Sequence, residues 1–569
     1  MTQRVKTLSI IFLSLCFLGF VVLALPPTCN LLISLVEQLM GRELRDPGRW
    51  IEIIQHCSTI ALCVIALVFF LGLTKKGNDF ARLIKQECHP FLQFLYSRAF
   101  VIMAVGTFAF YFLCFYKLID SDFYYADDLW RSLDGSRSWI GFSRYVSEFL
   151  SIVLHNNFYL PDIAPLTQFI SLAVYSFSTI LLAWLVTEGK ITVGSLLVCS
   201  LLFLSPFNAQ NLSYRFDSPY MALSAFFPIV PFLFMQEKKS FVFISIISLI
   251  LCCMSYQAGT SIYILLAIFF ATSLWLKKET YQKIFTFVGF SVLAFALALV
   301  LFKLLFMNTI NNGPDSYSAN ISLSVMPQNL KMYLSNTISN FGGLWIKGFV
   351  AISILVAFVL AIKVSRQNKL VTAIFLVGMG LLALFLSFGP YLVFAKPLFS
   401  SRSFTGFSML VSLVGISIYK NRQIHSNHSK SLWVLFPVFL VVYGCVVFQF
   451  AYGVASAEQK DYQEFRVEIL LADLNEYAQP TGKNYVSFSG SIGLSDGIAV
   501  NGDTFPLINQ LVTVVPSGGG IWNDDLLSVY NFNCEDEYLS ENPGWPLLTS
   551  SYYHDIYGEG NHFFVVLKN

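Results

Sequence analysis

Long apolar runs recur along most of the chain, and they constrain its fold more than any other feature. Of 569 residues, 56% are hydrophobic and 12% are charged, whereas soluble proteins carry about a quarter charged residues. A segment that crosses a bilayer needs about 20 mostly apolar residues. The sequence therefore predicts a polytopic α-helical membrane protein. About thirteen spans are expected, at residues 8–25, 58–74, 98–118, 167–187, 192–206, 219–235, 240–256, 258–276, 284–307, 343–363, 370–393, 403–419 and 432–452.

The loops between these runs divide into a basic set and a mixed or acidic set. If the N-terminus lies in the cytoplasm, every cytoplasmic loop is basic, which agrees with the excess of Lys and Arg on the inner side of membranes. The basic residues concerned are Lys75, Lys76, Arg82, Lys85, Lys190, Lys238, Lys239, Lys277, Lys278, Lys283, Arg366, Lys369, Lys420, Arg422 and Lys430. We therefore expect a cytoplasmic N-terminus, with its first apolar run retained as a span rather than removed as a signal peptide. The segments expected outside are 26–57, 119–166, 207–218, 308–342, 394–402 and 453–569.

The last part of the chain differs in composition from the rest, being less hydrophobic and more charged. Residues 458–477 have helical periodicity, and residues 484–488 and 562–567 have the pattern of strands. We predict two domains: a multi-span transmembrane domain over residues 1–452 and a small α/β domain, outside the cytoplasm, over residues 453–569.

Residues 139–153 carry apolar side chains at intervals of three and four, with serines and charged groups between them. This pattern predicts an amphipathic helix that lies in the headgroup plane, or one that packs against the spans. Both descriptions can hold at once.

Two adjacent carboxylates, Asp127 and Asp128, follow the third apolar run. Acidic groups beside hydrocarbon are costly, so they indicate a functional site by default, although Asp also favours ordinary turns. One carboxylate could take a proton from an attacking hydroxyl while the other fixes the loop. The sequence does not separate the two roles. Tyr125 and Trp130 flank the pair and could stack on a sugar.

Several cationic and polar residues in the outside loops could complete a site for a sugar phosphate. A guanidinium binds phosphate through a two-pronged fork, although these side chains could equally pair with nearby acids. The phosphate-binding candidates are Arg131, Arg215, Lys396 and Arg402. Asn211, Tyr214 and Asp217, in the loop 207–218, are candidates for sugar binding. The eleven cysteines have no metal-ligand spacing, and a net charge of +2 gives no indication of nucleic acid as a partner.

These residues resemble the Gtr-type membrane glucosyltransferases, which modify bacterial O-antigen. Residues 123–135 carry the likeness, and it extends to Trp139 and Arg144, to residues 211–218, to residues 256–257 and to the region of Arg402. Phe142 and Ser143 depart from the family pattern, which has Gly before the arginine.

The resemblance implies a GT-C-type enzyme of the bacterial inner membrane that works on the periplasmic face. It implies transfer of glucose from undecaprenyl phosphate to lipid-linked O-antigen repeats, with inversion and a change of serotype. Asp127 or Asp128 would be the base, and no metal or cofactor is expected. Companion proteins would make the lipid-phosphate glucose and translocate it across the membrane.

Two other functions remain open at this stage. A polymerase or ligase of polyprenyl-linked glycans also has many spans and outside arginines. A flippase for a lipid-linked glycan would need polar groups near the middle of the membrane, and the predicted spans hold almost no carboxylates or histidines.

Overall fold

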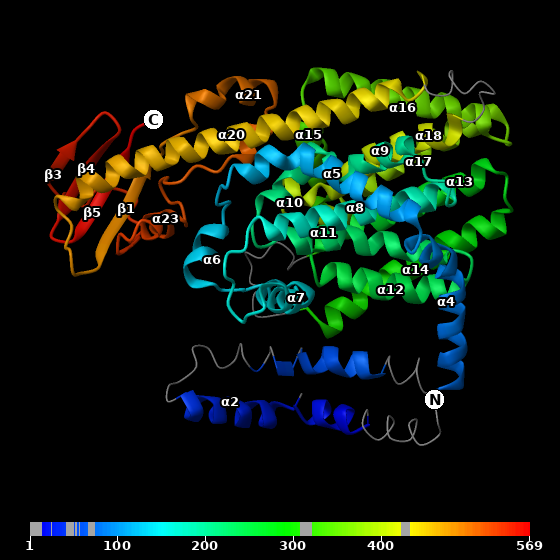
Figure 1. Cartoon of the computed structure of the whole chain (residues 1–569), viewed down its shortest axis with the longest axis horizontal. Coiled ribbons are helices and arrows are strands. Elements are labelled where there is room, and N and C mark those ends of the chain that lie inside the picture. The colour runs from blue at the N-terminus through cyan, green and yellow to red at the C-terminus, as the bar shows by residue number, and fades with distance from the viewer. Residues whose placement is uncertain are drawn as a thin grey trace.

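The computed structural model describes residues 14–23, 25–40, 51, 54–55, 57–66, 74–307, 321–422 and 433–569. Most of its long helices run along the long axis of the molecule, and a small sheet lies at one end (Figure 1). The helices are α2 (Pro26–Met40), α4 (Lys75–Leu95), α5 (Arg98–Asp120), α6 (Asp128–Asp134), α7 (Tyr145–His155), α8 (Leu166–Thr187), α9 (Val193–Leu204), α10 (Ala209–Ser213), α11 (Ser218–Phe226), α12 (Lys238–Cys253), α13 (Thr260–Leu276), α14 (Tyr281–Leu305), α15 (Met326–Asn340), α16 (Leu344–Val364), α17 (Lys369–Leu386), α18 (Thr405–Asn421), α20 (Phe436–Asn475), α21 (Ala499–Thr504), α22 (Ile508–Leu511) and α23 (Asn523–Val529).

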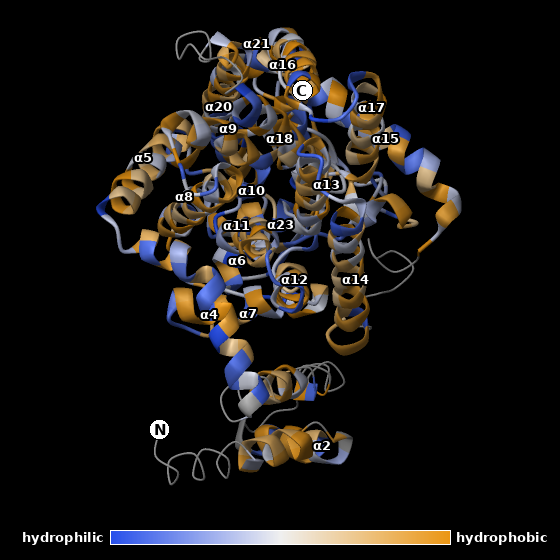
Figure 2. Cartoon of the chain, turned by 90° about the vertical axis from the view of Figure 1, so that its right-hand side faces the viewer, coloured by the Kyte–Doolittle hydropathy of each residue, from blue (hydrophilic) through white to orange (hydrophobic). Residues whose placement is uncertain are grey.

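Helices cover every predicted span from residue 98 onward, but not all of them have the length of a span. Among the described residues, seven helices are long and apolar enough to cross a membrane, or nine if each of two bent pairs is one span. Hydrophobic residues line the outer helices, including α5 and α14 (Figure 2). These helices indicate a membrane protein, although they do not confirm the expected thirteen spans. The predicted spans 8–25 and 58–74 lie partly outside the described residues.

The shortfall arises because several apolar runs form short or broken helices. Helices α12 and α18 have 16 and 17 residues. In the run 219–235, α11 gives way to the 3₁₀ segment η3 (Phe227–Phe234), which contains Pro228 and Pro231. Proline removes a backbone donor and interrupts the α-helical pattern.

The segment that follows α9 was expected to be an outside loop, yet residues 205–222 are buried throughout. Its chain bends by 54° after α9 and continues through η2 (Pro206–Asn208) into α10. Its polar groups find partners inside the protein: Asn208 donates to the Phe203 carbonyl at 3.0 Å, and Ser213 bonds to the Tyr452 hydroxyl at 2.8 Å. Irregular backbone is tolerated at membrane depth only where protein satisfies it in this way.

Helix α7 forms within the predicted amphipathic segment and turns its polar side inward. Ser147 and Ser151 are buried, and the Ser147 hydroxyl donates to the Ser255 carbonyl at 3.0 Å. Phe149 and Val153 are 65% and 60% exposed. The helix therefore packs against the bundle with its serines and leaves an apolar face outward, as a lipid-facing helix does.

Helix α20 is a single helix of 40 residues, about 60 Å long, where the sequence predicted a last span and a separate helix. The expected domain boundary at residues 452–453 falls inside it. Its second half packs on a five-stranded sheet of order β2-β1-β5-β4-β3. The strands are β1 (Asn484–Gly490), β2 (Cys534–Glu535), β3 (Leu547–Ser550), β4 (His554–Glu559) and β5 (His562–Leu567). Strands β1 and β5 match the two predicted strands; β1 pairs in parallel with β2 and β5, and β4 is antiparallel to both β3 and β5.

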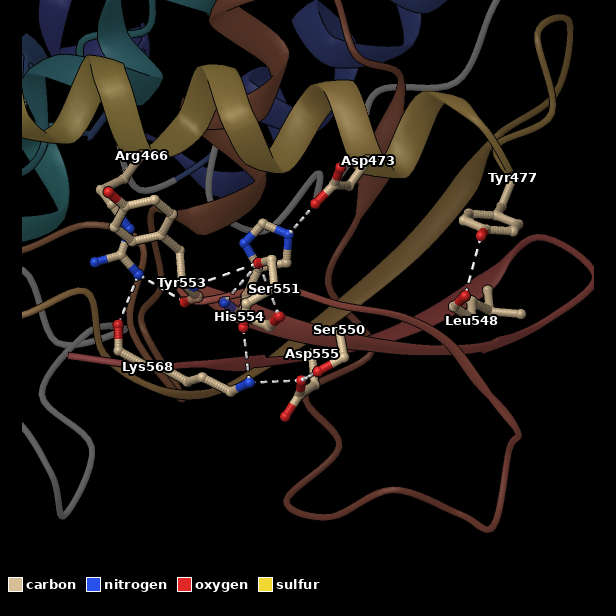
Figure 3. Close-up of polar contacts among 10 residues, drawn as sticks. All are labelled: Arg466, Asp473, Tyr477, Leu548, Ser550, Ser551, Tyr553, His554, Asp555 and Lys568. Atoms are coloured by element: carbon tan, nitrogen blue, oxygen red, sulfur yellow. Dashed lines mark hydrogen bonds and ion pairs between the residues drawn. The ribbon is translucent and has the colours of Figure 1, made fainter.

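Polar contacts join α20 to this sheet (Figure 3). The Arg466 guanidinium donates to the Tyr553 and Lys568 carbonyls at 2.8 and 2.7 Å. Farther along, Asp473 contacts buried His554 at 2.8 Å. Because these bonds satisfy a buried arginine and the sheet's own backbone, they hold the sheet at a fixed position on the helix.

Leu129 of α6 connects the C-terminal unit to the membrane helices. It is 2% exposed and belongs to the same apolar cluster as Leu470, Leu526 and Val565. Helix α6 follows directly on Asp127, so the C-terminal unit supports the loop that carries both aspartates.

Leu129→Ala is therefore expected to lower the free energy of unfolding by about 2–5 kcal/mol through a cavity in this cluster. Thermal unfolding of the purified chain measures the change. Leu133→Ala on the same helix is the control, since Leu133 is 44% exposed. Equal effects of the two substitutions would contradict this packing.

Candidate active site

The two aspartates sit where the loop after α5 turns into α6. Ala126 has a φ of 51°, in the left-handed region, and such a backbone is retained only where its surroundings hold it. Asp127 occupies the position before the first residue of α6, and Asp128 is that first residue. The turn sends their side chains into different surroundings.

Asp128 is completely buried and ties two segments together. Its Oδ2 accepts the backbone N–H groups of Tyr125 and Arg215 at 3.2 and 2.9 Å. Burial raises the pKa of Asp128 to about 8, and the charge of Asp217 adds to this rise. The two N–H groups and Arg131 oppose the rise only in part. At neutral pH, Asp128 is thus mainly protonated and serves as a link between the loop before α6 and the segment before α11.

This pKa gives a testable pH dependence. The unfolded carboxyl ionises near 3.8 while the folded one keeps its proton to about 8, so stability falls as pH rises across this range. Asp128→Asn keeps the acceptor oxygen and cannot ionise. We expect its melting temperature to fall less than that of the wild type between pH 4 and pH 8. If the melting temperatures of the two proteins change equally with pH, Asp128 is not buried and protonated in the folded state.

Asp127 is half-buried and accessible. Its side chain makes no capping hydrogen bond to α6. Its charge acts on two groups across the site, Arg402 and Tyr214. Asp127 is therefore the carboxylate of the pair that a substrate can reach.

Two of the predicted phosphate ligands are already neutralised by acids. Arg131 lies 3.5 Å from Asp217, donates to two backbone carbonyls and packs against the Trp139 ring. Arg215 pairs with Asp122 at 2.7 Å and Asp162 at 2.9 Å. These contacts give both arginines a structural function, because each already has a carboxylate of the protein within ion-pair distance.

Of the five arginines at positions 131, 137, 144, 215 and 402, only Arg402 and Arg144 have no carboxylate within ion-pair distance in the described part of the chain. Arg402 donates to the Tyr214 hydroxyl at 2.8 Å, and Arg144 lies over the Tyr256 ring at 4.6 Å. The Nε atoms of both arginines and the Tyr256 hydroxyl are buried without a hydrogen-bond partner among the described residues. Buried donors normally have acceptors, and these two arginines also lack an acid partner among the described residues, so this group of donors is suited to an anion.

The charges of these groups act on one another. Burial lowers the pKa of Arg144, and the positive charge of Arg402 lowers it further. Burial also works against the charge on Arg402, but Tyr256, Tyr214 and Asp127 raise its pKa above the ordinary value. Asp127, Arg144 and Arg402 thus share one electrostatic environment, which an anion would stabilise.

The predicted sugar-binding residues are mostly inside the protein. Tyr125 and Tyr214 are buried and their rings meet edge to face at 4.8 Å. The half-buried ring of Trp130 packs against the guanidinium of Arg131. The buried rings of Tyr125 and Tyr214 offer no free face of the kind that stacking requires, whereas Trp130 is partly exposed.

The polar residues of the predicted sugar site differ in whether their hydrogen-bonding groups have partners. Asp217 accepts a hydrogen bond from the Trp139 indole. Asn211 donates to Asn208 at 2.8 Å, while its own Oδ1 is buried without a partner among the described residues. Lys396 is exposed on the loop before η7 (Ser401–Ser403).

Sequence reasoning left two residues out of the candidate site, Arg144 and Tyr256. Both lie in the region of family likeness, and Arg144 is one of the outside arginines. What distinguishes Arg144 is that no acid pairs with it among the described residues, and only the folded structure reveals that. Among the described residues, no group of three His, Cys, Asp or Glu side chains could hold a metal ion.

The fold and this site define a helical membrane protein with a carboxylate and two uncompensated arginines at one end of its helices. Residues 115–413, more than half of the chain, match the family described as glucosyl transferase GtrII. The chain belongs to this family of glucosyltransferases. It is also 28% identical over 174 residues to an uncharacterized 55.3 kDa protein in the gtrB 5′ region of Salmonella phage P22. That match spans 30% of this chain and 35% of the phage protein.

Proposed function

We propose that the chain transfers glucose from undecaprenyl phosphate to lipid-linked O-antigen repeats. The observation that carries this proposal is an accessible carboxylate, Asp127, whose charge acts on Arg402, together with Arg144 and Arg402, which have no acid partner among the described residues. Membership of the GtrII family supports a glucosyl donor. The basic loops at the far end of the helices support a periplasmic site in a bacterial inner membrane, with the C-terminal unit on the same side.

The chemistry follows from the positions of these three side chains. The acceptor hydroxyl attacks the anomeric carbon from the face opposite the phosphate, and its proton passes to the Asp127 carboxylate. The bond between the anomeric carbon and the phosphate oxygen breaks, and its electron pair stays on that oxygen. Arg144 and Arg402 stabilise the charge that develops there. The product has the inverted configuration, and the two protein cations take the place of a metal.

The test compares O-antigen from cells with and without this gene, in a host that supplies the lipid donor through companion synthase and flippase proteins. Mass and linkage analysis is expected to show one added hexose per repeat. A change in chain length without added hexose would indicate a polymerase or ligase instead. Glycan transport into vesicles that lack any acceptor, with no added hexose, would indicate a flippase. Transfer by purified protein in the presence of a chelator tests independence from metal.

A further inference from the structure

A basic, apolar-walled groove lies at the opposite end of the helices from Asp127. Helix α18 begins at Thr405, close to Arg402 in the chain, and ends at Asn421, next to Lys420, after 17 residues, about 25 Å away. The groove encloses about 620 Å³ between the end of α8 and helices α13, α16, α17 and α18. A second chamber of about 510 Å³ lies on the other side of α13, toward α12 and α14. Both sizes fall in the usual range for ligand pockets, about 300–1,000 Å³.

The two chambers share their charged mouth and little else. Glu188, Ser273, Lys277 and Lys420 line both. The neighbouring residues Phe269 and Phe270 of α13 face different chambers. Helix α13 therefore separates two apolar cavities that meet at a pair of lysines.

The charges at this mouth are not balanced within the protein. Lys277 pairs with Glu188 at 3.2 Å. Lys420, Lys190 and Arg366 line the groove as well, and their side chains have no ion pair among the described residues. Lys420 instead lies over the Phe269 ring at 5.5 Å. Four cations against one carboxylate leave a net positive mouth, which is complementary to an anionic headgroup.

The depth of the groove matches one leaflet. Along α18 its lining runs from Leu410 to Asn421, about 16 Å at the rise of an α-helix. Half of a bilayer's hydrocarbon core is about 15 Å. A ligand with its charge at the mouth would thus place its apolar part in the leaflet on that side.

We propose that this is a binding site for a two-chain anionic phospholipid. Its phosphate lies between Lys277 and Lys420, and one acyl chain occupies each chamber. The site is separate from the proposed donor site and does not depend on the enzyme's reaction. Two chambers around a single charged mouth fit two acyl chains better than a single polyprenyl chain.

Two pairs of matched variants test the site. Lys277→Ala with Lys420→Ala removes the charge, and its control is Lys363→Ala, an exposed lysine outside both linings. Gly380→Leu narrows the first chamber, because Gly380 lines it. A Cβ at this position meets nothing within 4 Å, so the substitution should be tolerated. Gly378→Leu is its control, because Gly378 lies on the same helix and is equally open but does not line the chamber. The glycine pair keeps the proposal testable if the lysine double variant fails to fold.

The measurement is thermal unfolding of the full chain in neutral detergent during titration with phosphatidylglycerol, phosphatidylcholine or inorganic phosphate. Of the three compounds, phosphatidylglycerol is expected to stabilise the wild type at the lowest concentration. The lysine double variant should need about ten to thirty times more, and Gly380→Leu should also bind more weakly than Gly378→Leu. Equal effects of phosphatidylcholine, equal effects of inorganic phosphate, or unchanged titrations in both test variants would overturn the proposal.

Discussion

Asp127→Asn is expected to lower the rate of glucosyl transfer by about 10²- to 10⁴-fold, the usual contribution of a general base. Asparagine has nearly the same size as aspartate but cannot accept the proton of the acceptor hydroxyl. Asp127 makes no side-chain capping bond and is only half-buried. Its replacement should therefore leave folding and donor binding largely intact. The rate is measured with purified protein, lipid-phosphate glucose and a lipid-linked acceptor, beside a melting curve.

The neighbouring Asp128 provides the control for this experiment. The two residues are adjacent and chemically identical, yet Asp128 is completely buried and bonded to two backbone N–H groups. If Asp127 is the base, Asp127→Asn loses activity at wild-type stability, whereas Asp128→Asn keeps activity with an altered pH dependence of stability. The reverse pattern would assign the base to Asp128 and end the mechanism proposed for Asp127.

The sequence located the helices and the candidate loop well, because both depend on local patterns. Apolar runs of about 20 residues predict helices wherever the solvent is lipid, and helices cover each such run from residue 98 onward. The count of spans was less predictable. Whether a run such as 219–235 stays straight depends on prolines and on neighbours that accept a broken helix, and hydropathy reports neither.

Which arginines are paired with acids and which belong to the candidate site could not be predicted, because this depends on partners distant in sequence. Arg215 pairs with Asp122 and Asp162, more than 50 residues away. Arg131 reaches Asp217 across a similar separation. In the sequence these arginines look like Arg402. Only the fold shows that Arg402 is left without an acid among the described residues.

The same reasoning explains why the burial of the loop 207–218 was not predicted. Its many polar residues suggest contact with water, and nothing local reveals that Gln210, Asn208 and Ser213 are satisfied inside the protein. Gln210 illustrates the point, since its amide links Tyr125 on one side to Ser400 and Arg402 on the other. A polar segment can therefore be a buried scaffold that brings the parts of a site together.

Arg402→Gln is expected to lower the maximal rate of transfer by about 10²- to 10³-fold, because it removes a donor aimed at the leaving phosphate. Arg144→Gln should cause a loss of the same kind. The two losses should not add fully in the double variant, since both arginines act on one group. Arg402→Lys tests the geometry: it keeps the charge but lacks the two-pronged fork, so its activity should lie between those of Gln and wild type.

A matched control separates this function from a general need for positive charge. Arg137 lies near the same loop but pairs with Glu148 at 2.7 Å, so Arg137→Gln is expected to stay within about tenfold of wild type. The measurement that distinguishes the two functions of an arginine is whether its replacement changes kcat or KM. Stabilisation of the leaving phosphate in the transition state lowers kcat when it is lost, whereas an arginine that only holds the donor raises KM. If Arg144→Gln and Arg402→Gln both keep wild-type kcat, the phosphate leaves elsewhere and the unfilled donors of this site bind another group.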